Sequence, residues 1–137
     1  MSERNKTVVH SLFEDLNKGN LSLVYDAFAT DVTFHNAGTD HFGDLNGFKR
    51  FQSEIRVGFP DLRFIIDNVI AEDDRVSYRY TLLGTHKGWY MGMSATGKQV
   101  NMTGMGILRI AHGKIAEGWF VPDLLGLLQQ LGALPPH

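Results

Sequence analysis

The chain of 137 residues contains no cysteine, no long apolar run and no excess of basic charge. Without cysteine it has no disulfide bond, no thiolate nucleophile and no cysteine-ligated zinc. No segment approaches the roughly 20 apolar residues of a membrane-spanning helix. The first residues, Met-Ser-Glu-Arg-Asn-Lys, lack the apolar stretch of a signal peptide. The formal net charge is −2, so no basic surface suggests nucleic-acid binding. Together with the lack of cysteine, of a signal-like stretch and of a membrane-length apolar run, this leads us to expect a cytoplasmic protein that binds neither nucleic acid nor membranes.

Apolar residues recur at helical spacing in the first part of the chain. Hydrophobic residues make up 43% and charged residues 20% of the sequence, which is ordinary for a globular domain with one core. The spacing predicts helices over residues 8–18, 21–28 and 48–59. Gly19 is a stop signal for the first of these, and Pro60-Asp61 ends the third. We expect one domain over residues 1–137.

The hydrophobic period changes to two from residue 62 onward. It predicts strands over residues 62–70, 76–86, 100–110 and 115–121, in addition to a short strand over 31–36. A last apolar helix follows Asp123. Helices followed by antiparallel strands indicate an α+β domain. We expect a cone-shaped, curved antiparallel sheet wrapped around the N-terminal helices, with an open pocket for an apolar, roughly planar ligand.

Five short motifs follow one another along the chain. They are Phe59-Pro-Asp-Leu62, Gly84-Thr-His-Lys-Gly88, Ala95-Thr-Gly-Lys98, His112-Gly-Lys-Ile115, and Glu117-x-Trp119-x-x-x-Asp123 followed by Leu127-Leu-Gln-Gln-Leu-Gly132. In this order and spacing they resemble the SnoaL-like polyketide cyclases, within the nuclear-transport-factor-2-like superfamily of α+β barrels. The resemblance covers nearly the whole chain.

The resemblance implies an intramolecular aldol condensation that needs neither cofactor nor metal. Cyclases of this kind deprotonate an acidic C–H beside carbonyl groups of a polycyclic polyketide ester, and the enolate attacks a nearby carbonyl. The family's acid/base carboxylate matches Asp123 here. Such an enolate is already stabilised by conjugation, so the protein needs one proton-transfer group, a pocket that holds the reacting carbons together and the exclusion of water.

Asp123 and Trp119 each have a second interpretation. Asp123 precedes a helix, where aspartate commonly caps the first turn. A capping hydrogen bond would lower its pKa, whereas burial in an apolar pocket would raise it. Trp119 is either part of the core or pocket wall, or an aromatic plate on which a flat substrate stacks. We expect Trp119 and Asp123 to line the same cavity.

Arg79 and Glu117 are charged residues within apolar strands. If Arg79 faces inward, its charge must be paired with a carboxylate such as Glu117 or Asp123. Such a pair is either a structural ion pair or an electrophilic aid to a developing enolate oxygen. Both residues are therefore candidates for substrate binding.

Two histidines and a methionine complete the candidate substrate-binding residues. His86 belongs to the Gly-Thr-His-x-Gly motif and is expected at the pocket or its rim, or in a bond to a loop backbone. His35 ends the first predicted strand. Met105 lies on the long strand, where methionine adapts to flat ligands or fills the core. His35, Asp40 and His41 could imitate a metal cluster, but their spacing follows no helix or strand face, and we expect no metal.

The alternation in residues 76–86 also bears on assembly. Val76, Tyr78, Tyr80 and Leu82 share one strand face, and we expect this to be the convex face, buried in a homodimer or a larger homo-oligomer.

Two other functions remain open on the same fold. One is an isomerase or epoxide hydrolase, for which Asn101, Arg79, Asp123 and Glu117 would supply the polar groups. The other is a small-molecule-binding domain without catalysis, in which Asp123 is a helix cap alone.

Overall fold

Helices and strands follow one another largely as the sequence pattern predicts. In the computed structural model, the described residues, 2–36 and 43–135, form four helices and five strands. The helices are α1 (Ser2–Lys18), α2 (Leu21–Asp26), α3 (Leu45–Gly58) and α4 (Leu124–Leu131). The strands are β1 (Phe28–Asn36), β2 (Arg63–Glu72), β3 (Arg75–Thr85), β4 (Gln99–Ala111) and β5 (Lys114–Pro122).

The five strands form one curved, mixed sheet in the order β1-β5-β4-β3-β2. Strands β2 to β5 are antiparallel neighbours, as predicted. Strand β1 instead pairs in parallel with β5. The sheet is therefore mixed rather than wholly antiparallel. Strands β1 and β5 are not joined by a hairpin: α3 and the strands β2, β3 and β4 lie between them in the chain, and such a long connection allows parallel pairing.

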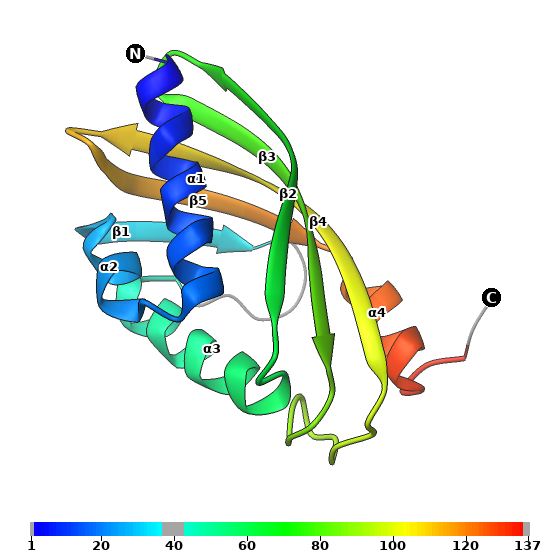
Figure 1. The fold of residues 1–137 in the computed structure, drawn as a ribbon. Helices are drawn as coiled ribbons and strands as arrows, with labels where there is room; N and C mark the ends of the chain where they lie inside the picture. Colours follow the sequence, from blue (N-terminus) through cyan, green and yellow to red (C-terminus); the bar gives the residue numbers. More distant parts are fainter. Residues whose placement is uncertain (1, 37–42, 136–137) are drawn as a thin grey trace.

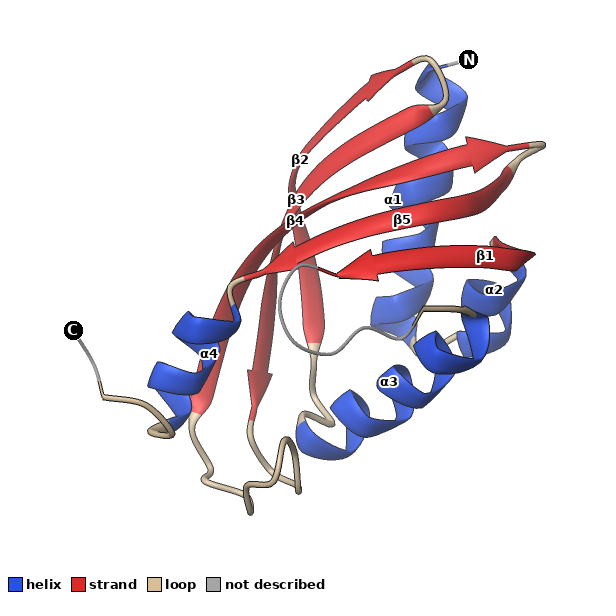
Figure 2. Ribbon diagram, turned by 180° about the vertical axis from the view of Figure 1, so that it is seen from behind, coloured by secondary structure: helices blue, strands red, loops and turns tan. Residues whose placement is uncertain are grey.

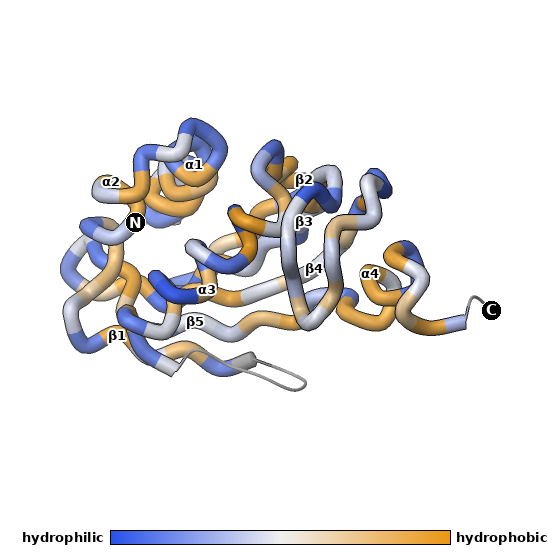
Figure 3. Tube along the Cα trace, turned by 90° about the horizontal axis from the view of Figure 1, so that it is seen from below, coloured by the Kyte–Doolittle hydropathy of each residue, from blue (hydrophilic) through white to orange (hydrophobic). Residues whose placement is uncertain are grey.

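Helices α1 and α3 cover the concave face of the sheet, and α4 lies beside the end of β4 (Figures 1 and 2). Helix α1 turns its apolar stripe, Val9, Leu12, Phe13 and Leu16, into the core. In Figure 3 its hydrophilic segments lie toward the outside of the molecule, and α4 is mainly hydrophobic, with five leucines among its eight residues. This division follows from the helical period of apolar residues.

The alternation along β3 places its apolar residues on the concave face, not the convex one. Tyr78 and Tyr80 are buried, and the ring of Phe13 on α1 lies 5.3 Å from that of Tyr78 and 6.3 Å from that of Tyr80. Val76 and Leu82 are buried on the same face. The prediction that these four residues form an exposed convex patch is therefore wrong: the covering helix packs on the face that bears the aromatic rings, and period two alone does not distinguish the faces.

Two glycines of β4 make room for these tyrosines. Gly104 pairs directly with Tyr80, and Gly106 with Tyr78. A Cβ atom at Gly104 would lie 2.5 Å from the Tyr80 hydroxyl oxygen. One at Gly106 would collide with the Tyr78 hydroxyl and would lie 2.7 Å from the carbonyl oxygen of Trp119. The rings therefore lie flat across β4 because the strand has no side chains at these positions.

We expect Gly106→Ala to lower the free energy of unfolding by about 2–3 kcal/mol, the range for overpacking a close-packed site. The added methyl group meets both a side chain and the backbone there. Gly104→Ala should cost less, about 1 kcal/mol, because its methyl group meets the end of one side chain. Urea unfolding of both variants measures the difference. Equal stability of the two would contradict the placement of the rings.

Candidate functional site

The concave face encloses a cavity of about 670 Å³, walled mainly by apolar side chains of α1, α3, β3, β4 and α4. Its volume lies within the range of small-molecule sites. Helix α4 contributes Leu124 and Leu127, and the end of β5 contributes Phe120 and Pro122. The described lining residues with hydrogen-bonding side chains are Gln52, Glu54, Tyr78, Tyr80, Trp89 and Tyr90. Such a cavity accommodates a flat apolar molecule with a small number of polar groups.

The tyrosines of the cavity are neutral hydrogen-bond donors. Burial raises the pKa of Tyr80 and of Tyr90 to about 12, and it raises the pKa of Tyr78 as well. Glu54, near the exposed mouth, is the one carboxylate among the described lining residues. None of these residues was predicted from the sequence to belong to the ligand site. The glycines at 104 and 106, opposite tyrosines 80 and 78, were the signal that could have identified two of them.

Asp123 caps helix α4. Its Oδ1 accepts a hydrogen bond of 2.9 Å from the backbone N–H of Gly126, and its side chain packs against Gly126. The residue is exposed and is not among those lining the cavity, although both of its chain neighbours, Pro122 and Leu124, are. Asp123 therefore stands at the cavity rim with its carboxylate turned to its own helix.

Trp119 lies on the convex face, away from the cavity. It pairs with the exposed Ile107 of β4 and with His35 of β1, so all three share the outer face. Its ring stacks on His35 with centroids 5.4 Å apart, and the Arg75 guanidinium lies 5.0 Å from it. The prediction that Trp119 and Asp123 line one cavity is wrong, because the register of β5 turns its alternate residues, Phe120 and Pro122, inward.

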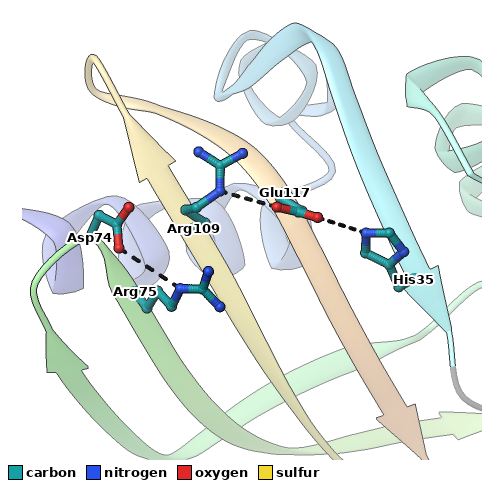
Figure 4. A network of polar contacts seen from close by, with 5 residues as sticks. All are labelled: His35, Asp74, Arg75, Arg109 and Glu117. Atoms are coloured by element: carbon teal, nitrogen blue, oxygen red, sulfur yellow. Dashed lines mark hydrogen bonds and ion pairs between the residues drawn. The ribbon is translucent and has the colours of Figure 1, made fainter.

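His35, Glu117 and Arg109 form a polar network on the same convex face (Figure 4). Glu117 Oε2 lies 2.8 Å from His35 Nε2, and Arg109 Nε donates to Glu117 Oε1 at 3.1 Å. The hydrogen bond with His35, followed by the bond and charge of Arg109, lowers the pKa of Glu117. The partner of Glu117 is thus Arg109 rather than Arg79.

Arg79 and Met105 also lie on the convex face, directly opposite one another. Both are exposed, and Arg79 has no ion-pair partner among the described residues. Five of the residues predicted to bind substrate are therefore gathered on the outer side of the sheet: His35, Arg79, Met105, Glu117 and Trp119.

His86 is fully buried and holds loops rather than lining the cavity. Its Nδ1 lies 2.9 Å from Thr96 Oγ1 and accepts from the Thr96 N–H at 3.3 Å. Its backbone binds Lys98 and Gly97. The ring stacks on Phe59, which does line the cavity. His86 therefore supports the cavity wall from behind.

No group of three or more potential metal-ligating side chains occurs within residues 2–36 and 43–135. Of the three residues considered as an imitation of a metal cluster, Asp40 and His41 lie outside the described residues. In the same part of the chain, no helix is both long enough and apolar enough to cross a membrane.

The sequence model of the SnoaL-like polyketide cyclases matches residues 7–131, which is nearly the whole chain. The chain belongs to the SnoaL-like polyketide cyclase family. This agrees with the resemblance seen in the sequence motifs. No curated protein matches the chain.

Several solved structures of other proteins are similar to this chain in fold. AclR from Streptomyces galilaeus, provisionally described as a hydroxylase, superimposes with a TM-score of 0.92 at 27% identity, over 100% of this chain and 86% of its own. IdmH from Streptomyces antibioticus, provisionally a polyketide cyclase, has a TM-score of 0.83 at 27% identity, over 93% and 98%. A provisional SnoaL-like cyclase from Jannaschia sp. CCS1 has a TM-score of 0.87 at 21% identity, over 98% and 96%, which is a likeness of fold.

The Glu117 network gives the stability of this family member an acid dependence. Because the folded-state pKa of Glu117 is lowered from 4.5, its ionised form stabilises the fold above about pH 4.5, and this contribution is lost as pH falls through the lowered pKa. We expect Glu117→Gln to be less stable than the unmodified chain at pH 7 and equally stable well below pH 4.5. Urea unfolding between about pH 2 and 7 measures this.

Glu14→Gln, an exposed acid on α1, is the matched control and should change stability little across the same range. A constant difference between Glu117→Gln and the unmodified chain at all pH values would show that the network does not act through ionised Glu117.

Proposed function

We propose that the chain binds a flat, carbonyl-rich small molecule in the concave cavity. It then catalyses the closure of a new ring within that molecule, without a cofactor. The observation that carries this proposal is the apolar cavity of about 670 Å³, in a chain of the SnoaL-like family. The apolar walls suit an aromatic ligand, and they exclude water from a carbanion-like intermediate. The reaction is an intramolecular aldol addition: a C–H proton leaves, the resulting enolate carbon bonds to a carbonyl carbon, and the new alkoxide takes up a proton.

Asp123 is the proposed proton-transfer group. Its neighbours Pro122 and Leu124 both line the cavity, which supports a place for Asp123 at the edge of a ligand in that cavity. The cap hydrogen bond uses Oδ1, and Oδ2 has no hydrogen bond to any described residue. One carboxylate oxygen therefore holds the helix while the other is available to accept and return the substrate proton.

The function is tested with an aromatic polyketide methyl ester that has an acidic C–H between two carbonyls. Ring closure should give a product of unchanged mass, or of that mass less one water, without any added cofactor. In D₂O the protein should also accelerate exchange of the acidic C–H, which reports the first proton transfer separately. A product heavier by one oxygen would instead indicate the hydroxylase activity by which AclR is described.

A binding domain without catalysis is the second candidate, and the capping of α4 by Asp123 favours it. It predicts tight ligand binding without C–H exchange. The epoxide hydrolase alternative loses support, because Asn101, Arg79 and Glu117 belong to the outer face of the sheet.

Asp123→Asn separates these candidates. Asparagine keeps most of the capping ability but carries no proton, so turnover should fall by on the order of 10²–10⁴-fold while unfolding free energy falls by less than about 1 kcal/mol. Asp123→Ala should lose activity and also about 1 kcal/mol or more of stability. Steady-state rates and urea unfolding are measured on the same preparations.

Glu54→Gln is the matched control, because Glu54 is the carboxylate at the cavity mouth. It should keep most of the turnover. If Asp123→Asn keeps full activity, Asp123 is not the proton-transfer group. If, in addition, Glu54→Gln loses activity, Glu54 is the proton-transfer group instead.

The convex face is the proposed interface of a homodimer, through residues other than those the sequence indicated. Its exposed apolar side chains are Ile65, Ile70, Met105, Ile107 and Val121. The face also offers Glu72 and Arg79, one charge of each sign without an ion-pair partner among the described residues. In a two-fold dimer the same patch meets itself, so a patch with both signs of charge is self-complementary.

We expect the chain to sediment as a dimer at micromolar concentration and Met105→Lys to weaken the dimer at least tenfold, because it puts a charge at the centre of an apolar interface. Leu125→Lys is the control, since Leu125 is 52% exposed on α4, away from the sheet face. Analytical ultracentrifugation gives both dissociation constants. A monomeric unmodified chain, or equal effects of the two variants, would contradict this interface.

A further inference from the structure

Two tyrosine hydroxyls of the cavity wall make no hydrogen bond within the part of the chain that the structure describes. Tyr78 and Tyr80 both line the cavity, and neither hydroxyl has a hydrogen bond to another described residue. Among the described residues, the fully buried side-chain polar atom that lacks a partner is Nε2 of His86. The two tyrosine hydroxyls have no partner among the described residues either, yet they are not fully buried atoms. Because both residues line the cavity, we infer that their hydroxyls are accessible from it.

The packing around the two rings fixes the positions of their hydroxyls. Phe13 packs on both rings, and Phe64 packs edge-on against Tyr80 with centroids 5.8 Å apart. On the other side each ring ends above a glycine of β4. Because the rings are held from both sides, the two donors are in place before a ligand arrives, and binding costs little further ordering.

The spacing of the two hydroxyls indicates how many ligand oxygens they meet. They end at Gly104 and Gly106, two residues apart on one strand, which corresponds to roughly 6–7 Å. One acceptor at ordinary hydrogen-bond distance from both would require a spacing below about 5.6 Å. Each hydroxyl therefore faces a different acceptor.

Resting on the ligand-binding function proposed above, we propose that Tyr78 and Tyr80 select flat ligands with two ring oxygens. Each hydroxyl donates a hydrogen bond to one carbonyl or phenolic oxygen of the same molecule. An unpartnered hydroxyl in an apolar wall discriminates against a ligand that brings no oxygen, because its desolvation is then uncompensated. These tyrosines determine specificity and are not assigned the proton transfer.

Two probes that differ in their ring oxygens test this: anthraquinone-2-sulfonate and anthracene-2-sulfonate. The unmodified chain should bind the quinone on the order of tenfold more tightly, as expected of two neutral hydrogen bonds. The double variant Tyr78→Phe, Tyr80→Phe, which keeps both rings, should lose this preference. Tyr25→Phe is the matched control, because Tyr25 does not line the cavity, and should keep it. Calorimetric titration gives the dissociation constants.

Each outcome decides between the two proposals. Equal binding of both probes by the unmodified chain, or a preference that survives in the double variant, overturns the role of the tyrosines and leaves the ligand-binding cavity standing. Binding of neither probe at the limit of solubility overturns both.

Thermal unfolding provides a second readout. Since the hydroxyls have no hydrogen-bond partners among residues 2–36 and 43–135, the double variant should melt at the same temperature as the unmodified chain or higher. A fall of more than about 5 °C would show that the hydroxyls serve the fold, and would overturn the proposal.

Discussion

The buried ring of His86 joins three segments that close one end of the cavity. Its Nδ1 holds the loop at Thr96, its backbone pairs with Lys98, and its face supports Phe59. Asp61 adds two contacts at the same end, because its carboxylate accepts hydrogen bonds from the N–H and the hydroxyl of Thr85. Three of the family motifs, around residues 59–62, 84–88 and 95–98, therefore share one structural task. These contacts, together with the hydrogen bonds from the N–H groups of Lys87 and Gly88 to the carbonyl of Gly58, hold the base of the segment that carries Tyr90 to the cavity.

Helix α4 closes the other end of the cavity and is attached to the sheet along its length. Asp123 continues the ladder by donating its N–H to the Thr103 carbonyl, and it caps the helix through its side chain. Near the other end, the Gln130 side chain binds both the N–H and the carbonyl of Asn101, at 2.8 and 2.7 Å. These contacts hold Leu124 and Leu127 against the cavity. The proposed acid/base residue thus also fixes the wall beside which it acts.

The sequence predicted the elements well and the orientation of the sheet poorly. The apolar stripe of α1 and the alternation of β3 and β4 follow directly from residue spacing, and the α+β class follows from their order. The alternation could not reveal which face the helices cover, so Tyr78 and Trp119 were each assigned to the wrong side. That choice depends on contacts distant in sequence, such as Phe13 with Tyr78. The parallel pairing of β1 with β5 is equally non-local.

The candidate site was predictable where it depends on local chemistry. A carboxylate before an apolar helix identifies Asp123 as a cap, and the structure has that cap. The cavity donors were missed because their significance lies in what stands opposite them on the next strand. This gives the pairs Tyr80–Gly104 and Tyr78–Gly106 an evolutionary consequence. A side chain larger than glycine at either β4 position fits after the tyrosine opposite has become smaller, so the two members of each pair must change together. A family member that binds another ligand is then expected to differ at both members of a pair. The residues at positions 78, 80, 104 and 106 should therefore change together when ligand preference changes during evolution.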